Sequence, residues 1–224
     1  VACPVLGQDL IKRQLTKDDY NLWCRLETDK ISENGKWVSY ALRYESHLDT
    51  LFVKSTYTNA KYEFAGALNG QFASEDIFAC LDLKENLHLV NLISGNSILI
   101  KRVKKFDISG NGRFLISLES NDDSTMNLAI RGKNGKLVKR IENATQYTIN
   151  NSGNALLYTT AQSDNQNAGI VNLKKTISIR EVILNIHSDI KSLTWSEDGS
   201  TAAFYTEDSS STHLYYYQIA SQSL

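Results

Sequence analysis

One short phrase recurs about five times along the chain and constrains the fold more than any other feature. In four copies an apolar residue precedes small polar residues, a glycine follows, and a largely apolar or aromatic run comes next. These copies are ISENGKWVSY (31–40), ISGNGRFLIS (108–117), INNSGNALLY (149–158) and WSEDGSTAAF (195–204). A fifth, degenerate copy, FASEDIFACL (72–81), fits if Asp76 takes the glycine position.

The spacing of this phrase predicts a β-propeller. With Asp76 included, successive glycine positions are separated by 41, 36, 41 and 46 residues. A period of roughly 40 residues with strand-like content is typical of propeller blades. We therefore expect an all-β chain of four-stranded antiparallel blades, about five in number, that form an incomplete ring. Because propellers host unrelated activities, the repeat predicts architecture and says little about function.

The unit that starts at Phe106 shows the expected blade most clearly. FDIS, FLISLES, NLAIRG and KLVKRI have the pattern of short strands separated by polar turns. Asn-Gly and Asp-Gly in the turns supply the positive φ that two-residue hairpins require. Apolar and polar residues alternate imperfectly in the strands, as expected where both faces of a strand are partly buried.

The repeat also predicts how the chain is divided. We expect a signal-peptide remnant or disordered tail at residues 1–10, a leader at residues 11–30 and the partial propeller at residues 31–224. Only the stretch from Thr16 to Leu26, inside this leader, has the features of a helical turn. The expected blades span residues 31–70, 71–105, 106–146, 147–190 and 191–224.

Composition excludes two broad classes of function. The 224 residues are 42% hydrophobic and carry a formal net charge of −1. This balance argues against a general nucleic-acid surface, because phosphate binding depends on clustered Lys and Arg. No segment reaches the roughly 18 consecutive apolar residues of a membrane-spanning helix.

The start of the chain predicts export. VACPVLGQ (1–8) is apolar and uncharged, like the tail of a secretory signal whose beginning is missing. We therefore expect a periplasmic or extracellular protein, and the small residues before Cys3 also fit a lipid-modified cysteine.

The three cysteines form no CxxC pair. The apolar neighbours of Cys24 and Cys80 favour two buried thiols over a disulfide between them.

Motifs for catalysis and metal binding are missing from the sequence. It contains no GxSxG nucleophile elbow, and SDIK (188–191) is an S-x-x-K match of the kind expected by chance. The acidic pairs lack the DxDxDG spacing of a calcium loop and favour solvated turns: Asp122 with Asp123, and Glu207 with Asp208. The histidines form neither HxH nor HExxH: His47, His88, His187 and His213. We therefore assign no catalytic residue, no cofactor-binding residue, no metal ligand and no cofactor.

Two further clusters have structural and functional interpretations. In IKRVKKF (100–106), Lys101 and Lys105 fall on one face of an expected strand, and Arg102 and Lys104 fall on the other. Lysines on an outer strand discourage edge-to-edge pairing, and we favour this interpretation over an anion-binding strip.

Aromatic residues gather near the end of the chain: Trp195, Phe204, Tyr205, Tyr215, Tyr216 and Tyr217. Strands favour aromatic residues in any case, but these could also form a surface that stacks on carbohydrate or peptide.

The repeated phrases resemble a known family. ISENGKWVSY and WSEDGSTAAFYTE, with the later strand LYYYQIASQ, resemble the WD40-like repeats of TolB-type propellers. They resemble still more the N-terminal propeller of bacterial prolyl oligopeptidase (S9) family serine peptidases. The leader QLTKDDYNLWCRL is similar to that of exported members, so the resemblance covers residues 11–224.

The resemblance implies a division of labour in a longer parent protein. The propeller would gate the access of peptides to a C-terminal α/β-hydrolase domain, and the catalytic Ser, Asp and His would lie beyond this chain. Some family members hold the substrate amine with a Glu-Glu pair, and no such dipeptide occurs here. The alternatives are a non-enzymatic TolB-like interaction propeller and a carbohydrate-binding propeller. In each case an open ring would leave sheet edges free for oligomerisation.

Overall fold

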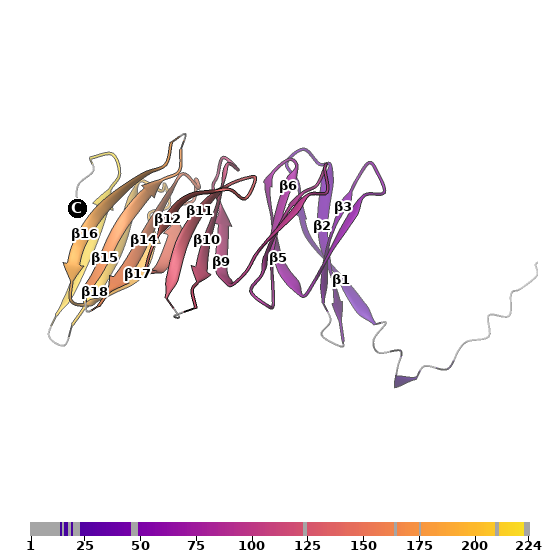
Figure 1. The fold of residues 1–224 in the computed structure, drawn as a ribbon, viewed down its shortest axis with the longest axis horizontal. Helices are drawn as coiled ribbons and strands as arrows, with labels where there is room; N and C mark the ends of the chain where they lie inside the picture. Colours follow the sequence, from indigo (N-terminus) through magenta and orange to yellow (C-terminus); the bar gives the residue numbers. More distant parts are fainter. Residues whose placement is uncertain are drawn as a thin grey trace, which may run out of the picture.

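The structure is a computed structural model that describes residues 14, 16–17, 19, 23–45, 49–122, 125–163, 165–174, 176–208 and 211–221. Within these residues the chain forms five antiparallel sheets, each built from strands that are consecutive in sequence. The sheets follow one another in a row from the indigo N-terminal end to the yellow C-terminal end (Figure 1). The predicted all-β propeller architecture is confirmed, and no described sheet combines strands from the two ends of the chain.

The strands have the following bounds. The first sheet contains β1 (Cys24–Ile31), β2 (Trp37–Tyr44), β3 (Thr50–Ser55) and β4 (Lys61–Ala65). The second contains β5 (Ala67–Ser74), β6 (Ile77–Asp82), β7 (Leu87–Asn91) and β8 (Ser97–Ile100). The third contains β9 (Val103–Ile108), β10 (Phe114–Ser120), β11 (Met126–Gly132) and β12 (Leu137–Ile141). The fourth contains β13 (Ala144–Ile149), β14 (Ala155–Gln162), β15 (Asn165–Asn172) and β16 (Ser178–Ile186). The described part of the fifth contains β17 (Asp189–Trp195), β18 (Thr201–Glu207) and β19 (Thr212–Gln218).

Apolar layers between successive sheets hold the row together. The middle strands supply two layers at once, because alternate side chains point to opposite faces of a strand. In β6, Phe78 and Cys80 belong to the layer shared with the first sheet, whereas Ile77 and Ala79 belong to the layer shared with the third. In β14, Tyr158 packs towards the third sheet and Leu157 towards the fifth. The expectation that strands are buried on both faces is therefore confirmed for these middle strands.

The four glycine-containing phrases form the same turn. In the first copy the Ser32 N–H donates to the Trp37 carbonyl, and the Gly35 N–H donates to the Ser32 carbonyl. Equivalent pairs of bonds occur in the turns that begin at Ser109, Asn150 and Ser196. The glycines of these turns all have positive φ, between 63° and 69°. Each turn encloses four residues, such as 33–36, so the expectation of two-residue hairpins is wrong for these copies.

Side chains of the phrase complete the turn. The Ser32 hydroxyl accepts a bond from the Trp37 N–H at 3.0 Å and donates to Asn34 Oδ1 at 2.9 Å. The last full copy repeats this arrangement with Ser196 and Asp198 in these two positions. The recurring small polar residues therefore satisfy backbone groups that a tight turn would otherwise leave unpaired.

The carboxylate in the last turn should make stability sensitive to acid. Hydrogen bonds from Ser196 and Ser200 lower the pKa of Asp198 from 3.8 to about 2. A group with a lowered folded-state pKa stabilises the fold above its unfolded pKa and loses that contribution as pH falls towards the folded value. We expect Asp198→Asn to reduce the loss of stability between pH 3.8 and about 2, measured by urea unfolding across that range. An unchanged pH dependence would contradict this role.

The degenerate copy forms a different turn. Ser74 pairs with Ile77, so only Glu75 and Asp76 lie between the strands. Asp76 is not among the described residues with positive φ. It therefore does not take the place of the glycine, and the prediction that placed it there is wrong because the turn is shorter.

Glycines of the later turns also allow close packing between sheets. A Cβ on Gly112 would lie 1.8 Å from the Ala73 carbonyl oxygen, and a Cβ on Gly153 would lie 2.2 Å from the Gly110 nitrogen. The Gly110 N–H donates to the Gly153 carbonyl at 2.8 Å, so the third and fourth turns are bonded directly. Around Gly35, by contrast, a Cβ would meet no atom within 4 Å. In the first copy of the phrase, the glycine is therefore required only by the conformation of its own turn. In the later copies, the glycine at this position also allows two sheets to pack closely.

The N-terminal part of the first sheet differs from expectation. Strand β1 occupies residues at the end of the predicted leader, because the strand that leads into each glycine turn belongs to the same sheet as the turn. Among the described residues of the leader there is a local turn, in which the Asp19 N–H donates to the Thr16 carbonyl at 3.1 Å. Residues 1–13, including Cys3, lie outside the described residues.

The two described cysteines are both free. Cys80 is fully buried in the layer between the first two sheets, as predicted. Cys24 is exposed, so the prediction of a buried thiol is wrong there, because β1 is an edge strand with mostly exposed side chains. The described residues form no helix with the length and apolarity that a membrane span needs.

Candidate functional site

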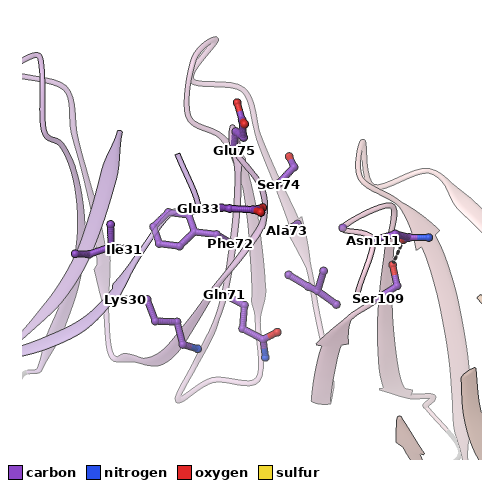
Figure 2. A pocket seen from close by; sticks show the side chains of 13 residues that line it. Lys30, Ile31, Glu33, Gln71, Phe72, Ala73, Ser74, Glu75, Ser109 and Asn111 are labelled. Atoms are coloured by element: carbon purple, nitrogen blue, oxygen red, sulfur yellow. Dashed lines mark hydrogen bonds between the residues drawn. The ribbon is translucent and has the colours of Figure 1, made fainter. Parts of the chain in front are cut away.

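A pocket of about 740 Å³ lies where the first strands of three successive sheets end. Lys30 and Ile31 at the end of β1, residues 71–74 at the end of β5 and Ile108 at the end of β9 form its walls. Turn residues Glu33, Glu75 and 109–112 complete it. Figure 2 shows side chains from all three sheets around this space. We call it the three-sheet pocket.

Close packing and hydrogen bonds fix the wall from the third sheet. Gly112 lies directly against the Ala73 carbonyl, which only a residue without a side chain allows. The Ser109 hydroxyl donates to Asn111 Oδ1 at 2.7 Å (Figure 2). The Asn111 amide in turn donates to the Leu173 carbonyl at 3.2 Å, which connects the turn to the end of β15 in the fourth sheet. The pocket wall is therefore supported by residues from the second to the fourth sheet.

The pocket combines charged groups with an apolar surface. Lys30 Nζ donates to the Gly70 carbonyl at 2.7 Å, which holds the ammonium group over β5. Glu33 and Glu75 project from the first and second turns, and Phe72 also lines the pocket (Figure 2). Among the described residues, no cation forms an ion pair with either glutamate. A ligand that carries both polar and apolar groups would find partners for each here.

The lining residues are suited to binding more than to bond cleavage. They include serine hydroxyls at Ser74 and Ser109 but no histidine or cysteine, so no nucleophile has an imidazole base beside it. Within the described residues no group of three or more His, Cys, Asp or Glu side chains could hold a metal ion. The pocket can therefore orient a ligand through carboxylates, amides and one ammonium group.

The residues that the sequence singled out do not meet in this pocket. Hydrogen bonds from Asn86 and His88 lower the pKa of Asp82, although burial alone would raise it, and His88 Nε2 lies 3.0 Å from Asp82 Oδ2. Lys191 of SDIK pairs with Glu207 at 2.8 Å, and Asp122 pairs with Arg102. His187, between β16 and β17, and His213, on β19, are both exposed. His47 and Asp123 lie outside the described residues.

The basic run at residues 100–106 does not form one continuous strand. Arg102 has a φ of 61°, which breaks the run between β8 and β9. Lys104 pairs with Glu85. Lys105 lies 4.4 Å from the centre of the Tyr147 ring, whose hydroxyl pKa is raised by burial and by the charge of Asp107. The predicted assignment of all four cations to two faces of one strand is therefore wrong. Both β8 and β9 are terminal strands of their sheets, so protection of these edges stays a prediction.

The C-terminal aromatic residues do not form one surface. Phe204 and Tyr217 are buried in the layer between the fourth and fifth sheets, and Tyr215 stacks on Phe204 there. The Trp195 indole N–H donates to the Thr148 carbonyl at 3.2 Å. Tyr216 is exposed on the opposite face of the fifth sheet, since neighbouring side chains of β19 alternate. Most of these aromatic side chains pack between sheets, which weakens the prediction of a surface that stacks on carbohydrate.

Sequence reasoning missed the charged residues of the three-sheet pocket. Glu33 and Glu75 each follow the serine of their copy of the repeated phrase, Ser32 and Ser74. The corresponding residue of the third copy is Gly110, which also lines the pocket. The residue that follows the serine varies between copies of the phrase, and this variation was the sequence signal that could have located the site.

Comparison with known proteins identifies the fold. No family model matches the sequence, and no curated protein matches it. The β-propeller domain of the Trilobed protease from Pyrococcus furiosus aligns with a TM-score of 0.52 at 13% identity over 88% of this chain and 70% of that chain. Acylaminoacyl peptidase from Pyrococcus horikoshii aligns with a TM-score of 0.50 at 9% identity over 90% of this chain. A eukaryotic initiation factor aligns with a TM-score of 0.53 at 12% identity over 87% of this chain and 52% of that chain.

These similarities establish a propeller fold and no more. At such low identity a shared architecture carries no assignment of activity. The chain spans 39% of the acylaminoacyl peptidase chain, so most of that protein has no counterpart here. The solved structures that align include two peptidases and an initiation factor, so the likeness in fold does not select one of these proteins as a guide to function.

Proposed function

We propose that this chain is the propeller portion of an exported S9-type serine peptidase, in which it controls peptide access to a hydrolase domain outside these residues. The three-sheet pocket is the observation on which the proposal depends. It lies at the ends of successive first strands and offers two carboxylates, an ammonium group and apolar side chains. A peptide presents amides, charged ends and apolar side chains, so such a pocket could hold one in a defined orientation.

Two further observations support this function. The fold resembles the propellers of two peptidases, and the phrase motifs resemble S9 propellers. Export to the periplasm or beyond, lipidation at Cys3 and oligomerisation through open sheet edges remain predictions.

A serine-directed fluorophosphonate tests the proposal on the full-length gene product. We expect the full-length protein to be labelled and the present chain alone to remain unlabelled. Glu33→Lys with Glu75→Lys should lower kcat/KM for peptides about tenfold without changing the rate of labelling, because the small probe needs no orientation by the pocket. The matched control reverses two exposed glutamates away from the pocket, Glu142→Lys with Glu197→Lys. Absence of labelling would exclude the peptidase, and equal effects of both double variants would exclude the role of the pocket.

A non-enzymatic interaction propeller is the second candidate. The likeness to an initiation factor is as close as the likeness to the peptidases, and that observation favours neither class. An unlabelled full-length protein that still bound a partner through its loops would support this alternative.

A further inference from the structure

The hairpin formed by β11 and β12 carries an unusual concentration of positive charge. Lys133, Lys136, Lys139 and Arg140 are all exposed, although the whole chain has a net charge of −1. Residues 124–141 contain no Asp or Glu. Among the described residues, none of these four cations forms an ion pair. The hairpin therefore presents positive charge that the fold itself does not neutralise.

Strand β12 is also a free sheet edge. It is the last strand of its sheet, in the order β12-β11-β10-β9. Leu137 and Val138 on this strand are 38% and 53% exposed. The fourth strands of the first and fourth sheets carry mixed charges instead, with Lys61 beside Glu63 on β4 and Arg180 beside Glu181 on β16. Unmixed positive charge on an edge repels a basic strand and attracts an acidic one.

A small cavity adjoins the hairpin. It has a volume of about 320 Å³, an apolar floor of Ile77, Leu89 and Ile98, and a polar rim that includes Lys133 and Asn134. The turn between β11 and β12 lies directly on this cavity, since a Cβ on Gly135 would come within 2.6 Å of Ile98 Cδ1. We call it the rim pocket. An apolar side chain could therefore enter it from a segment that runs along the hairpin.

We propose that the β11–β12 hairpin binds an extended acidic segment of a partner protein, with one apolar side chain anchored in the rim pocket. Such a segment would add a strand to β12 through main-chain hydrogen bonds, while the rim pocket selects its side chain. Its carboxylates would pair with Lys133, Lys136, Lys139 and Arg140. The site is separate from the three-sheet pocket, so this inference does not depend on the peptidase proposal.

Fluorescence anisotropy with a labelled peptide tests this inference. The probe is a peptide in which aspartates and glutamates flank a single leucine, and the comparison probe replaces that leucine with glycine. We expect Lys139→Glu with Arg140→Glu to weaken binding of the leucine peptide about tenfold. The glycine peptide should bind at least about tenfold more weakly than the leucine peptide, because it cannot bury an apolar side chain in the rim pocket. Binding should also weaken as salt is added.

The control variant makes the same change of net charge elsewhere. Lys36→Glu with Lys54→Glu reverses two exposed lysines that form no ion pair among the described residues. It should leave peptide binding within about twofold of the unmodified protein. Equal loss in both double variants would overturn the proposal, as would equal binding of the two peptides. Binding to vesicles of anionic lipid without binding to the peptide would also overturn it, in favour of a membrane surface.

Discussion

Replacing Gly112 by alanine is expected to destabilise the protein far more than the same replacement at Gly35. Both glycines have positive φ, 65° and 69°, so each alanine incurs a backbone cost of about 1–2 kcal/mol. At Gly112 the new methyl group would also lie 1.8 Å from the Ala73 carbonyl oxygen. Because that oxygen belongs to the backbone of β5, relief of the clash requires the third sheet to move relative to the second. Overpacking of this kind costs about 1–3 kcal/mol in addition.

Gly35 provides the matched control for this prediction. Its turn has the same hydrogen bonds, but a Cβ there would meet no atom within 4 Å. The free energy of unfolding, measured by urea denaturation with tryptophan fluorescence, should fall by about 1–2 kcal/mol for Gly35→Ala and by about 2–5 kcal/mol for Gly112→Ala. Equal losses would show that the turn conformation alone requires the glycines and that the contact between sheets contributes nothing.

The comparison of these two glycines shows how much of the fold the sequence could predict. Positive φ is a local property, so the phrase predicted glycine turns at residues 35, 112, 153 and 199 from their immediate neighbours. The period then predicted repeated sheets. Contact of Gly112 with Ala73 depends on how two sheets pack, and no residue near Gly112 in sequence reports it. Asp76 was misplaced for a similar reason, since the length of its turn depends on strand register.

The candidate site was less predictable than the fold. Lys30, Glu33 and Glu75 are unremarkable in sequence, and they share a pocket only because three sheets end at one place. The basic run at residues 100–106 was misinterpreted because the sequence pattern alone does not show that Arg102 leaves the strand. Local chemistry thus predicted turns and strands, whereas sites that join several sheets required the packed structure.

A buried ion pair in the third sheet provides a second large expected effect. Glu119 on β10 and Arg131 on β11 meet through two hydrogen bonds, Nε to Oε1 at 3.2 Å and Nη2 to Oε2 at 3.1 Å. The Ser117 hydroxyl donates to Glu119 Oε1 at 2.6 Å, and Arg131 also donates to the Gly135 carbonyl. The two side chains are only 11% and 15% exposed. Because water reaches these side chains poorly, each charge depends mainly on the other to offset the free-energy cost of its burial.

Glu119→Ala is expected to lower the free energy of unfolding by about 3–5 kcal/mol, because it leaves the Arg131 guanidinium buried without its carboxylate. The double variant Glu119→Met with Arg131→Leu should recover most of that loss, since apolar side chains of similar volume avoid the cost of burying charge. Lys191→Ala removes a partner from the exposed pair with Glu207, whose side chains are 44% and 51% exposed. It should lower the free energy of unfolding far less than Glu119→Ala does, because solvent screens an exposed pair. Urea unfolding of all three variants measures these differences. If Glu119→Ala cost no more than Lys191→Ala, solvent would already screen the Glu119–Arg131 pair, and the third sheet would not depend on it.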